Sequence, residues 1–422
     1  MPPLSSQSPI HIEKLQNKLT VLVIPRPGVG VITADLWVNV GSADETPAVN
    51  GASHFLEHML FKGAGPFGVG EIDCMIEGIG GVLNAATSHD FTQYYMTAAS
   101  ANLPVVLRAL AQMAQNAHLN AEDVDSERQV ILEEYSIKQD NPQGVLWEEL
   151  YYKAFEHGPY RLPILGTPET LANIGQPELK NYYERHYTPE NMTLMLVGDI
   201  EPARAVDLAR EAFGDFTRPY RPLIDRSKLT TQYASAGEHV IEKDANDTYG
   251  MLAVPAPALC GNAREICGLD VMQYVVGGGE ASVLYQEVKE KRRLATSIDA
   301  GYSHARHPDL FAVYFTCDDP VRAELTRSVL EIFDRAAQEK PTPAALHRAR
   351  KLLANTHAFS LETTGGMSGT IGYYYTITND VKFEREYMDT VLDISAEEVQ
   401  SLAQKYLAGR QPVQVAVRPK KG

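Results

Sequence analysis

The apolar and polar positions along the chain predict strands that alternate with helices. Two runs rich in β-branched residues, 19–24 and 31–40, are typical of strands, and a Pro and Gly cluster between them predicts a turn. Apolar residues recur with helical spacing over residues 52–61 and again over residues 121–139. The sequence Asp140-Asn141-Pro142 predicts the end of this second helix. The pattern as a whole predicts a mixed α and β protein.

The same succession of elements occurs twice. Residues 90–97 resemble residues 309–316, and each segment is typical of a strand. A helix and a strand within residues 179–197 recur within residues 399–417, and the later helix begins with a capping-box pattern at residues 395–398. The two offsets are nearly equal, since 309 − 90 = 219 and 413 − 193 = 220. Because two matches share nearly one offset, the sequence predicts a duplicated domain of roughly 200 residues.

The repeat predicts the fold class α+β, with two homologous α/β-sandwich domains that arose by tandem duplication. In each domain we expect a mostly antiparallel sheet covered by helices. The expected boundaries are residues 1–216 for the N-terminal domain, 217–237 for a linker and 238–422 for the C-terminal domain. The linker is assigned from Pro219 and Pro222, from its mixed charge and from its lack of periodicity.

Composition narrows the classes of partner. Of 422 residues, 44% are hydrophobic and 22% are charged, so a large core is possible. Lys and Arg number 38 against 54 Asp and Glu, and the net charge of −16 argues against nucleic acid or an anionic membrane as the main partner. The sequence has no apolar run of about 18 residues, so no membrane span is expected. Four cysteines without a Cys-x-x-Cys pair, and a start without a secretory pattern, favour a cytoplasmic protein, or a periplasmic one if a signal segment was removed.

Two histidines lie at a spacing that suits a metal ion. His54 and His58 occupy positions i and i+4 in a segment with helical periodicity, so both imidazoles lie on one face of a helix. Glu57 lies between them and can reach a water molecule on such a metal without being a ligand. Imidazole and carboxylate ligands suit zinc, and the order His-x-x-Glu-His is the inverted zincin motif. The alternative is a solvated helix with an incidental His pair.

A catalytic zinc site needs a third protein ligand. Glu127 and Glu134 occupy positions i and i+7 on the later helix, about two turns apart, so both carboxylates face the same way. One of them can bind the metal while the other braces a ligand. The spacing alone leaves open which carboxylate has which role.

A resemblance assigns these roles. Residues 51–63 resemble the active-site helix of the zinc peptidase family that includes pitrilysin, insulin-degrading enzyme and mitochondrial processing peptidase. Residues 127–134 resemble the helix with that family's third ligand, a Glu that follows the second His at the same spacing as Glu134 follows His58. The resemblance therefore implies that Glu134 is the third metal ligand and that Glu127 supports the ligands without binding the metal. Glu133 is then expected at the surface.

The resemblance extends over most of the chain and implies a single zinc site. The ligands would be His54, His58 and Glu134, all within the N-terminal domain. The equivalent positions of the second half, near residues 273–277, offer neither His nor Glu. One Zn2+ per chain is therefore expected.

Residues 80–92 resemble the family's strand whose edge holds the substrate in extended form. The resemblance implies substrate contacts at four successive residues, Asn84, Ala85, Ala86 and Thr87. An unpaired strand edge can bind any peptide backbone, whatever its side chains. The alternative is an ordinary core strand after a glycine turn.

The sequence departs from the family at two positions. Active relatives carry an Arg and, at the seventh position after it, a Tyr that hold the substrate carbonyl, and here these positions are Lys289 and Thr296. Lysine lacks the planar fork of arginine, and threonine is shorter than tyrosine. We therefore expect a homologous partner subunit that supplies the Arg and the Tyr, hence a heterodimer. The alternatives are compensation by Arg292 or Arg293, or a slower homodimer.

The expected function is that of a zinc metalloendopeptidase. Glu57 would activate a water molecule, and the substrates would be peptides or unfolded segments in a chamber between subunits. Two alternatives differ in class. One is a non-catalytic structural or core-type subunit of the same fold, and the other is a zinc-dependent binding module or a different zinc hydrolase.

Overall fold

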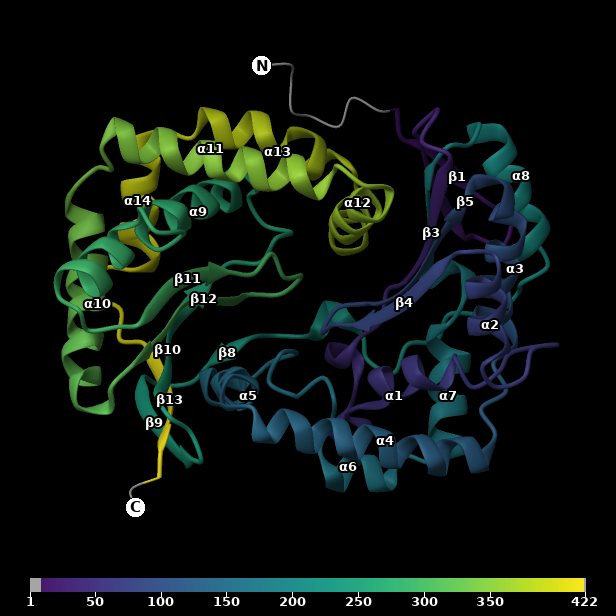
Figure 1. The fold of residues 1–422 in the computed structure, drawn as a ribbon, viewed down its shortest axis with the longest axis horizontal. Helices are drawn as coiled ribbons and strands as arrows, with labels where there is room; N and C mark the ends of the chain where they lie inside the picture. Colours follow the sequence, from purple (N-terminus) through teal and green to yellow (C-terminus); the bar gives the residue numbers. More distant parts are fainter. Residues whose placement is uncertain (1–8, 421–422) are drawn as a thin grey trace.

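The computed structural model describes residues 9–420, and these form two halves, each built on one sheet (Figure 1). The six-stranded first sheet has the strand order β1 (His11–Lys14), β2 (Thr20–Pro25), β7 (Met192–Gly198), β3 (Val31–Val38), β5 (Thr92–Ala99), β4 (Val82–Thr87). The five-stranded second sheet has the order β11 (Ser297–Tyr302), β12 (Asp309–Cys317), β10 (Thr248–Ala256), β13 (Val413–Pro419), β9 (Gly237–Lys243). A separate pair joins β6 (Phe155–His157) to β8 (Gln232–Tyr233).

The second sheet repeats the topology of the first. The order β2-β7-β3-β5-β4 corresponds to β9-β13-β10-β12-β11 in chain order and in space. In these corresponding orders, β2 pairs with β7 and β9 pairs with β13 in parallel. The other neighbouring strands of both orders are antiparallel. The predicted fold class, two homologous mostly antiparallel domains in tandem, is therefore confirmed.

Helices cover the outer faces of both sheets. Those of the first half are α1 (Ala52–Met59), α2 (Glu71–Gly78), α3 (Leu103–Asn116), α4 (Ala121–Asp140), α6 (Pro168–Asn173), α7 (Gln176–His186) and α8 (Pro202–Phe213). Those of the second half are α9 (Ala263–Val276), α10 (Arg322–Gln338), α11 (Pro343–Ser360), α13 (Lys382–Asp393) and α14 (Ala396–Tyr406), with a π-helix at Tyr285–Lys291. None of the helices between residues 9 and 420 combines the length and the apolar composition of a membrane span.

Two helices are exchanged between the halves. Helix α5 (Pro142–Ala154) belongs to the first half but packs on β10 and β13 of the second sheet. Helix α12 (Thr364–Thr378) belongs to the second half but packs on β3 and β7 of the first sheet, as Figure 1 shows. Each sheet therefore buries one face under a helix from the other half. Separating the halves would expose both apolar faces, so the exchange stabilises their arrangement.

The local signals in the sequence agree with the observed element ends. Asn141 accepts a hydrogen bond from the Gln143 amide and Pro142 occupies the first turn of α5, so the expected stop of α4 is also the start of α5. The Ser395 and Glu398 side chains form the expected capping box of α14.

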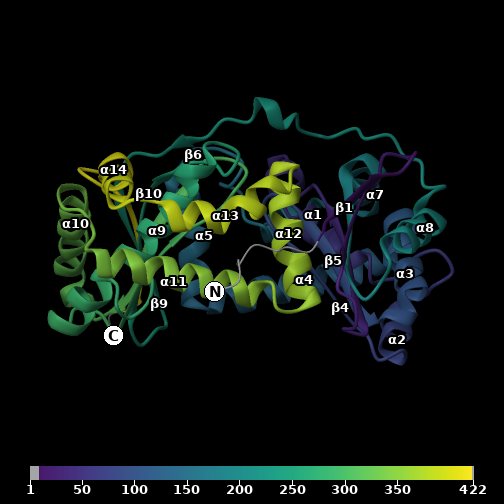
Figure 2. The same cartoon turned by 90° about the horizontal axis from the view of Figure 1, so that it is seen from above.

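The connection between α8 and β8 runs along one side of the molecule from the first half to the second (Figure 2).

The exchange leaves a carboxyl group between the halves, with a testable effect on stability. Asp35 of β3 is buried beneath α12 and accepts a hydrogen bond of 3.0 Å from Ser368. Burial raises the pKa of Asp35 to about 7, although the bond from Ser368 works against this. The carboxyl group therefore stabilises the fold below its unfolded pKa, near 4, and this stability is lost as the pH rises from there through 7.

We therefore expect Asp35→Asn to stabilise the chain more at pH 8 than at pH 4. The gain at pH 8 should be on the order of 2 kcal/mol, because the amide needs no proton to remain neutral. Chemical denaturation of both proteins at both pH values measures the difference. An equal effect of the substitution at the two pH values would contradict the buried, protonated state of Asp35.

Candidate metal centre

The helix with the two candidate histidines, α1, is held at its first turn by one carboxylate. Glu45 accepts hydrogen bonds from the backbone amides of Gly51 (2.7 Å) and Ser53 (2.6 Å) and from the Asn50 side chain (2.9 Å). These bonds satisfy amides that a helix start leaves without partners. Gly51 has φ 98°, and a Cβ there would lie 2.8 Å from the Leu165 carbonyl oxygen. The start of α1 is therefore fixed by contacts and by a glycine-specific conformation.

Helix α4 packs on α1 and brings Glu134 to the two histidines. The Oε2 atom of Glu134 lies 3.6 Å from Nε2 of His54 and 3.6 Å from Nε2 of His58. The three ligand atoms lie within 4.8 Å of one another, and the imidazole centroids are 4.7 Å apart. Within the described part of the chain, no other group of three His, Cys, Asp or Glu residues is placed to hold a metal ion.

The donor set fits zinc. The His54 side chain is buried, and burial, together with the nearby His58 and Lys138, lowers the pKa of His54 to about 3. The imidazole is therefore neutral at pH 7, as a metal ligand must be. Glu134 remains partly exposed, which leaves the site open on one side. Two imidazole nitrogens and one carboxylate are the protein ligands of a catalytic zinc site with an open position.

Glu127 is hydrogen-bonded to His58. Its Oε1 accepts a hydrogen bond of 2.9 Å from Nδ1 of His58, so the lone pair on Nε2 points toward Glu134. Lys62 lies 2.6 Å from the other oxygen of Glu127. Burial raises the pKa of Glu127, but the hydrogen bonds from Lys62 and His58 outweigh it and hold the pKa below its ordinary value. Glu127 is therefore ionised and fixes the His58 tautomer.

We expect Glu127→Gln to weaken zinc binding by about 10- to 100-fold, because the amide no longer favours the Nδ1-protonated tautomer of His58. Competition with a chromophoric chelator measures the zinc affinity. Glu133→Gln is the matched control, since Glu133 is an exposed residue on the same helix. Equal affinities of the two variants would contradict the orienting role of Glu127.

Glu57 lies next to the three candidate metal ligands but is not one of them. Its carboxylate accepts a short hydrogen bond from the Thr87 hydroxyl at the end of β4. Burial raises the pKa of Glu57, the Thr87 bond and His58 oppose this, and Glu134 reinforces it. A partly buried carboxylate with a raised pKa is suited to accept a proton near neutral pH.

The four predicted substrate-binding residues lie on the terminal strand of the first sheet. One edge of β4 pairs with β5, and no described strand pairs with the other edge. Thr87 pairs with Thr92 and Ala85 with Tyr94, which packs in the core beneath α1. Asn84 and Ala86 alternate with them and face the other side of the sheet. The edge next to Glu57 is therefore available for an added strand.

Lys289 and Thr296, which replace the Arg and Tyr of active relatives, lie in the second half. Lys289, on the π-helix, donates a hydrogen bond of 3.1 Å to the Tyr285 hydroxyl and lies over the same ring. Thr296 donates to the Thr316 carbonyl oxygen at 3.2 Å, beside β12. Arg292 contacts Ser328 and Glu331 on α10, and these contacts hold its guanidinium on that helix.

Two residues that contribute to the centre, Lys62 and Glu45, were not predicted from the sequence. Lys62 lies in the turn after α1, which ends at Met59, and its ammonium group reaches the Glu127 carboxylate. Glu45, which holds the start of α1, lies in the loop that precedes the helix. Neither Lys62 nor Glu45 lies within α1, so helical periodicity in the sequence indicates neither of them.

Comparisons with known proteins agree with the geometry. The family model described as insulinase, peptidase family M16, matches residues 20–168, and the model described as the peptidase M16 inactive domain matches residues 173–353. A protein of Streptomyces coelicolor named an uncharacterized zinc protease is 29% identical over 411 residues, 96% of this chain and 89% of the relative. The zinc protease PqqE of Helicobacter pylori is 26% identical over 415 residues, 96% of this chain and 92% of that protein.

A solved structure shows the same fold. The crystal structure of a protease from Helicobacter pylori superposes with a TM-score of 0.91 at 24% identity and covers 98% of this chain and 100% of that one. The two family models meet near residue 170, within the first half. The boundaries at residues 217 and 237 therefore stay a prediction.

Proposed function

Because this chain belongs to the M16 family of peptidases, we propose that it is a zinc metalloendopeptidase with one zinc ion on His54, His58 and Glu134. The observation that carries the proposal is the convergence of these three side chains beside Glu57 at a free strand edge. A scaffold protein has no physical requirement for this combination.

The residues of the chain have distinct roles in this proposal. A bound zinc ion supplies Lewis acidity, which lowers the pKa of water toward about 7 and polarises a carbonyl group. Glu57 accepts the proton of the attacking water as the new C–O bond forms, and it delivers that proton to the amine as the C–N bond breaks. Thr87 holds the Glu57 carboxylate by its hydroxyl. Glu127 keeps His58 in the tautomer that can bind the metal.

The proposed substrates are peptides and unfolded segments of proteins. The edge of β4 at Asn84–Thr87 would pair with the peptide backbone, so recognition depends on an extended conformation more than on particular side chains. Most of the backbone of a folded domain is already paired within that domain, and a chamber between subunits would exclude the domain sterically.

A partner subunit belongs to the proposal. Lys289 and Thr296 occupy the positions where active relatives carry Arg and Tyr, and both are engaged with other residues of the second half. We propose a heterodimer in which a homologous subunit supplies these two groups. A cytoplasmic location also stays a prediction.

We expect the double substitution Lys289→Arg and Thr296→Tyr to raise the peptidase rate of the isolated chain by about 100-fold. The added guanidinium and phenol would donate hydrogen bonds to the oxyanion of the transition state, and one such donor is typically worth about 10²–10³ in rate. The rate is measured with a fluorogenic peptide at fixed zinc occupancy. Replacing Arg292 with Lys is the control, because its guanidinium contacts α10. If the double substitution gives no gain, the absence of the Arg and Tyr donors does not explain a low rate of the isolated chain.

The non-catalytic alternative has weaker support. The M16 inactive-domain model matches residues 173–353, whereas His54, Glu57, His58 and Glu134 all lie within the insulinase match at residues 20–168. The inactive-domain match thus begins after all four of these residues and says nothing against their catalytic role.

The experiment that tests the proposed function compares an unfolded protein with its folded form. A disulfide-bonded protein is incubated with the zinc-loaded chain before and after reduction, and the products are identified by mass spectrometry. Internal cleavage of the reduced form alone is expected. Removal of terminal residues only, or no zinc-dependent cleavage with any candidate partner, would contradict an endopeptidase.

A further inference from the structure

Two loops that lead to the catalytic elements meet at a junction between the halves. Residues 39–51 connect β3 to α1, and residues 88–91 connect β4 to β5. The amides of Ser42 and Ala43 donate to the carbonyl oxygens of Ser88 (3.2 Å) and His89 (2.9 Å). A Cβ at Gly41 would lie 2.3 Å from the Ser88 oxygen, so only glycine allows this approach. The two loops are therefore in direct backbone contact.

Arg226, in the segment predicted as a polar linker, is the first of two arginines at this junction. Its guanidinium forms a bidentate ion pair with the buried Asp44. It also donates to the Asn39 carboxamide oxygen at 2.6 Å and to the Asp90 carbonyl oxygen at 3.1 Å. Burial disfavours its charge, but Asp44 outweighs this and raises the pKa of Arg226 above its ordinary value. Arg226 thus bonds to both loops at once.

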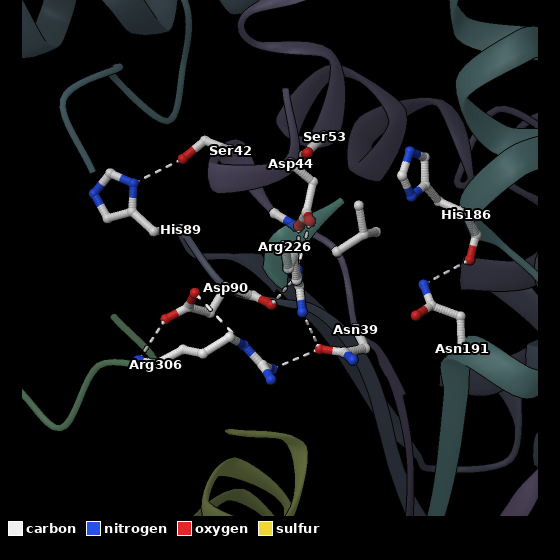
Figure 3. Close-up of polar contacts among 12 residues, drawn as sticks. Asn39, Ser42, Asp44, Ser53, His89, Asp90, His186, Asn191, Arg226 and Arg306 are labelled. Carbon is white, nitrogen blue, oxygen red and sulfur yellow. Dashed lines mark hydrogen bonds and ion pairs between the residues drawn. The ribbon is translucent and has the colours of Figure 1, made fainter. Parts of the chain in front are cut away.

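Arg306, from the second half, is the other arginine. It donates to the same Asn39 oxygen at 2.6 Å, so the Asn39 carboxamide lies between the two guanidinium groups, as Figure 3 shows. Its backbone amide donates to the Asp90 carboxylate at 3.1 Å. It also donates to the carbonyl oxygens of Thr376 (2.8 Å) and Ile377 (3.1 Å) near the end of α12. Arg306 therefore connects the exchanged helix to both loops.

Asp90 receives bonds from three parts of the chain. Tyr160 donates its hydroxyl to the Asp90 carboxylate at 2.7 Å, in addition to the bonds from Arg226 and Arg306. The same turn places the His89 ring 2.7 Å from the Ser42 hydroxyl oxygen and within 5.5 Å of the Tyr151 ring on α5. The turn at residues 88–91 is therefore held by the linker, by the second half, by Tyr160 and by the loop at residues 39–51.

In each loop, a residue of the junction is the chain neighbour of a residue that contacts the site. Thr87, which donates to the Glu57 carboxylate, directly precedes the turn at residues 88–91. Asp44 directly precedes Glu45, the carboxylate that holds the start of α1. The junction therefore constrains both ends of the Thr87–Glu57 contact, one through each loop.

We propose that Arg226 and Arg306 are positioning residues that set the placement of the β4 edge against Glu57, and that they couple this placement to the arrangement of the two halves. The inference rests on the proposed role of Glu57. A shift of the edge by about 1 Å would be enough to reduce turnover by as much as 100-fold. A lysine keeps the charge of Arg226 but lacks the fork that bonds Asp44, Asn39 and Asp90 together.

A double-mutant cycle on kcat tests the inference. Arg226→Lys and Thr87→Val are each expected to lower kcat by about 10- to 100-fold. If Arg226 acts through the Thr87–Glu57 contact, the combined variant should resemble Thr87→Val alone. Multiplication of the two losses would overturn the proposal and leave Arg226 with a merely structural role. Arg306→Lys serves as the second variant if Arg226→Lys does not fold.

A measurement without turnover separates this inference from the proposed function. Hydrogen exchange of the amides in residues 82–91 should be faster in Arg226→Lys than in the wild-type chain, both loaded with zinc. Arg264→Lys is the matched control, because Arg264 pairs with Glu398 and Asp393 on an exposed surface of the second half. Unchanged exchange would overturn the inference even if the chain is a peptidase. Faster exchange in a chain without peptidase activity would support the role of Arg226 in holding residues 82–91 and would reject the proposed function.

Discussion

Glu57→Gln is expected to lower the peptidase rate by about 100- to 10,000-fold while zinc remains bound. Proton transfer by a positioned carboxylate contributes about 10²–10⁴ to the rate of such a reaction, and the amide of Gln cannot accept a proton. The Gln oxygen can still accept the hydrogen bond from Thr87, so the local geometry is kept. His54, His58 and Glu134 are unchanged, and zinc stoichiometry should therefore equal that of the wild-type chain.

The measurement combines kcat on a fluorogenic peptide with metal analysis of the same sample. Glu133→Gln is the control, since Glu133 carries the same charge at an exposed position on α4. Retention of more than a tenth of the wild-type kcat by Glu57→Gln would show that another group transfers the proton. Loss of zinc together with activity would mean instead that Glu57 supports the metal.

Glu134→Ala is expected to remove both zinc binding and activity. Glu134 supplies the carboxylate that faces both histidines at 3.6 Å, so its loss leaves two ligands on one helix. The zinc affinity should fall by more than the roughly 100-fold upper range for a residue that only orients a ligand. The side chain is partly exposed, and the variant should keep its melting temperature in the absence of metal.

Zinc affinity of this variant is measured by chelator competition beside Glu127→Gln and Glu133→Gln. The expected order of affinity is Glu133→Gln, then Glu127→Gln, then Glu134→Ala. An affinity of Glu134→Ala equal to that of the Glu133 variant would exclude Glu134 as a ligand and redirect the search to another carboxylate of the site.

The duplication and the spacing of the candidate ligands along each helix could be predicted from the sequence, because both depend on local pattern. The i, i+4 spacing of His54 and His58 and the i, i+7 spacing of Glu127 and Glu134 place side chains on one face of a helix in any fold. The repeat required only similar elements in the same order, and the two sheets share that order. Contact between the two helices could not be derived from spacing, and there the resemblance identified Glu134.

The exchange of α5 and α12 could not be predicted from the sequence. The apolar face of α5 includes Val145, Leu146 and Leu150, and such a face packs equally well on either sheet as far as its pattern shows. Arg226 was missed for a related reason. Its surroundings carry mixed charge and have no periodicity, so the sequence predicts only a linker. The folded chain instead buries the Arg226 guanidinium between loops from distant parts of the sequence.

The most direct test of the central claim is hydrolysis of a quenched fluorescent peptide mixture by the purified chain, before and after removal of zinc. We expect one zinc ion per chain, cleavage that stops on treatment with a chelator, and recovery when zinc is returned. We also expect a low rate for the chain alone, because Lys289 and Thr296 replace the expected Arg and Tyr. Cleavage that persists without metal, or a chain that binds no zinc, would contradict the assignment of His54, His58 and Glu134 as a catalytic zinc site.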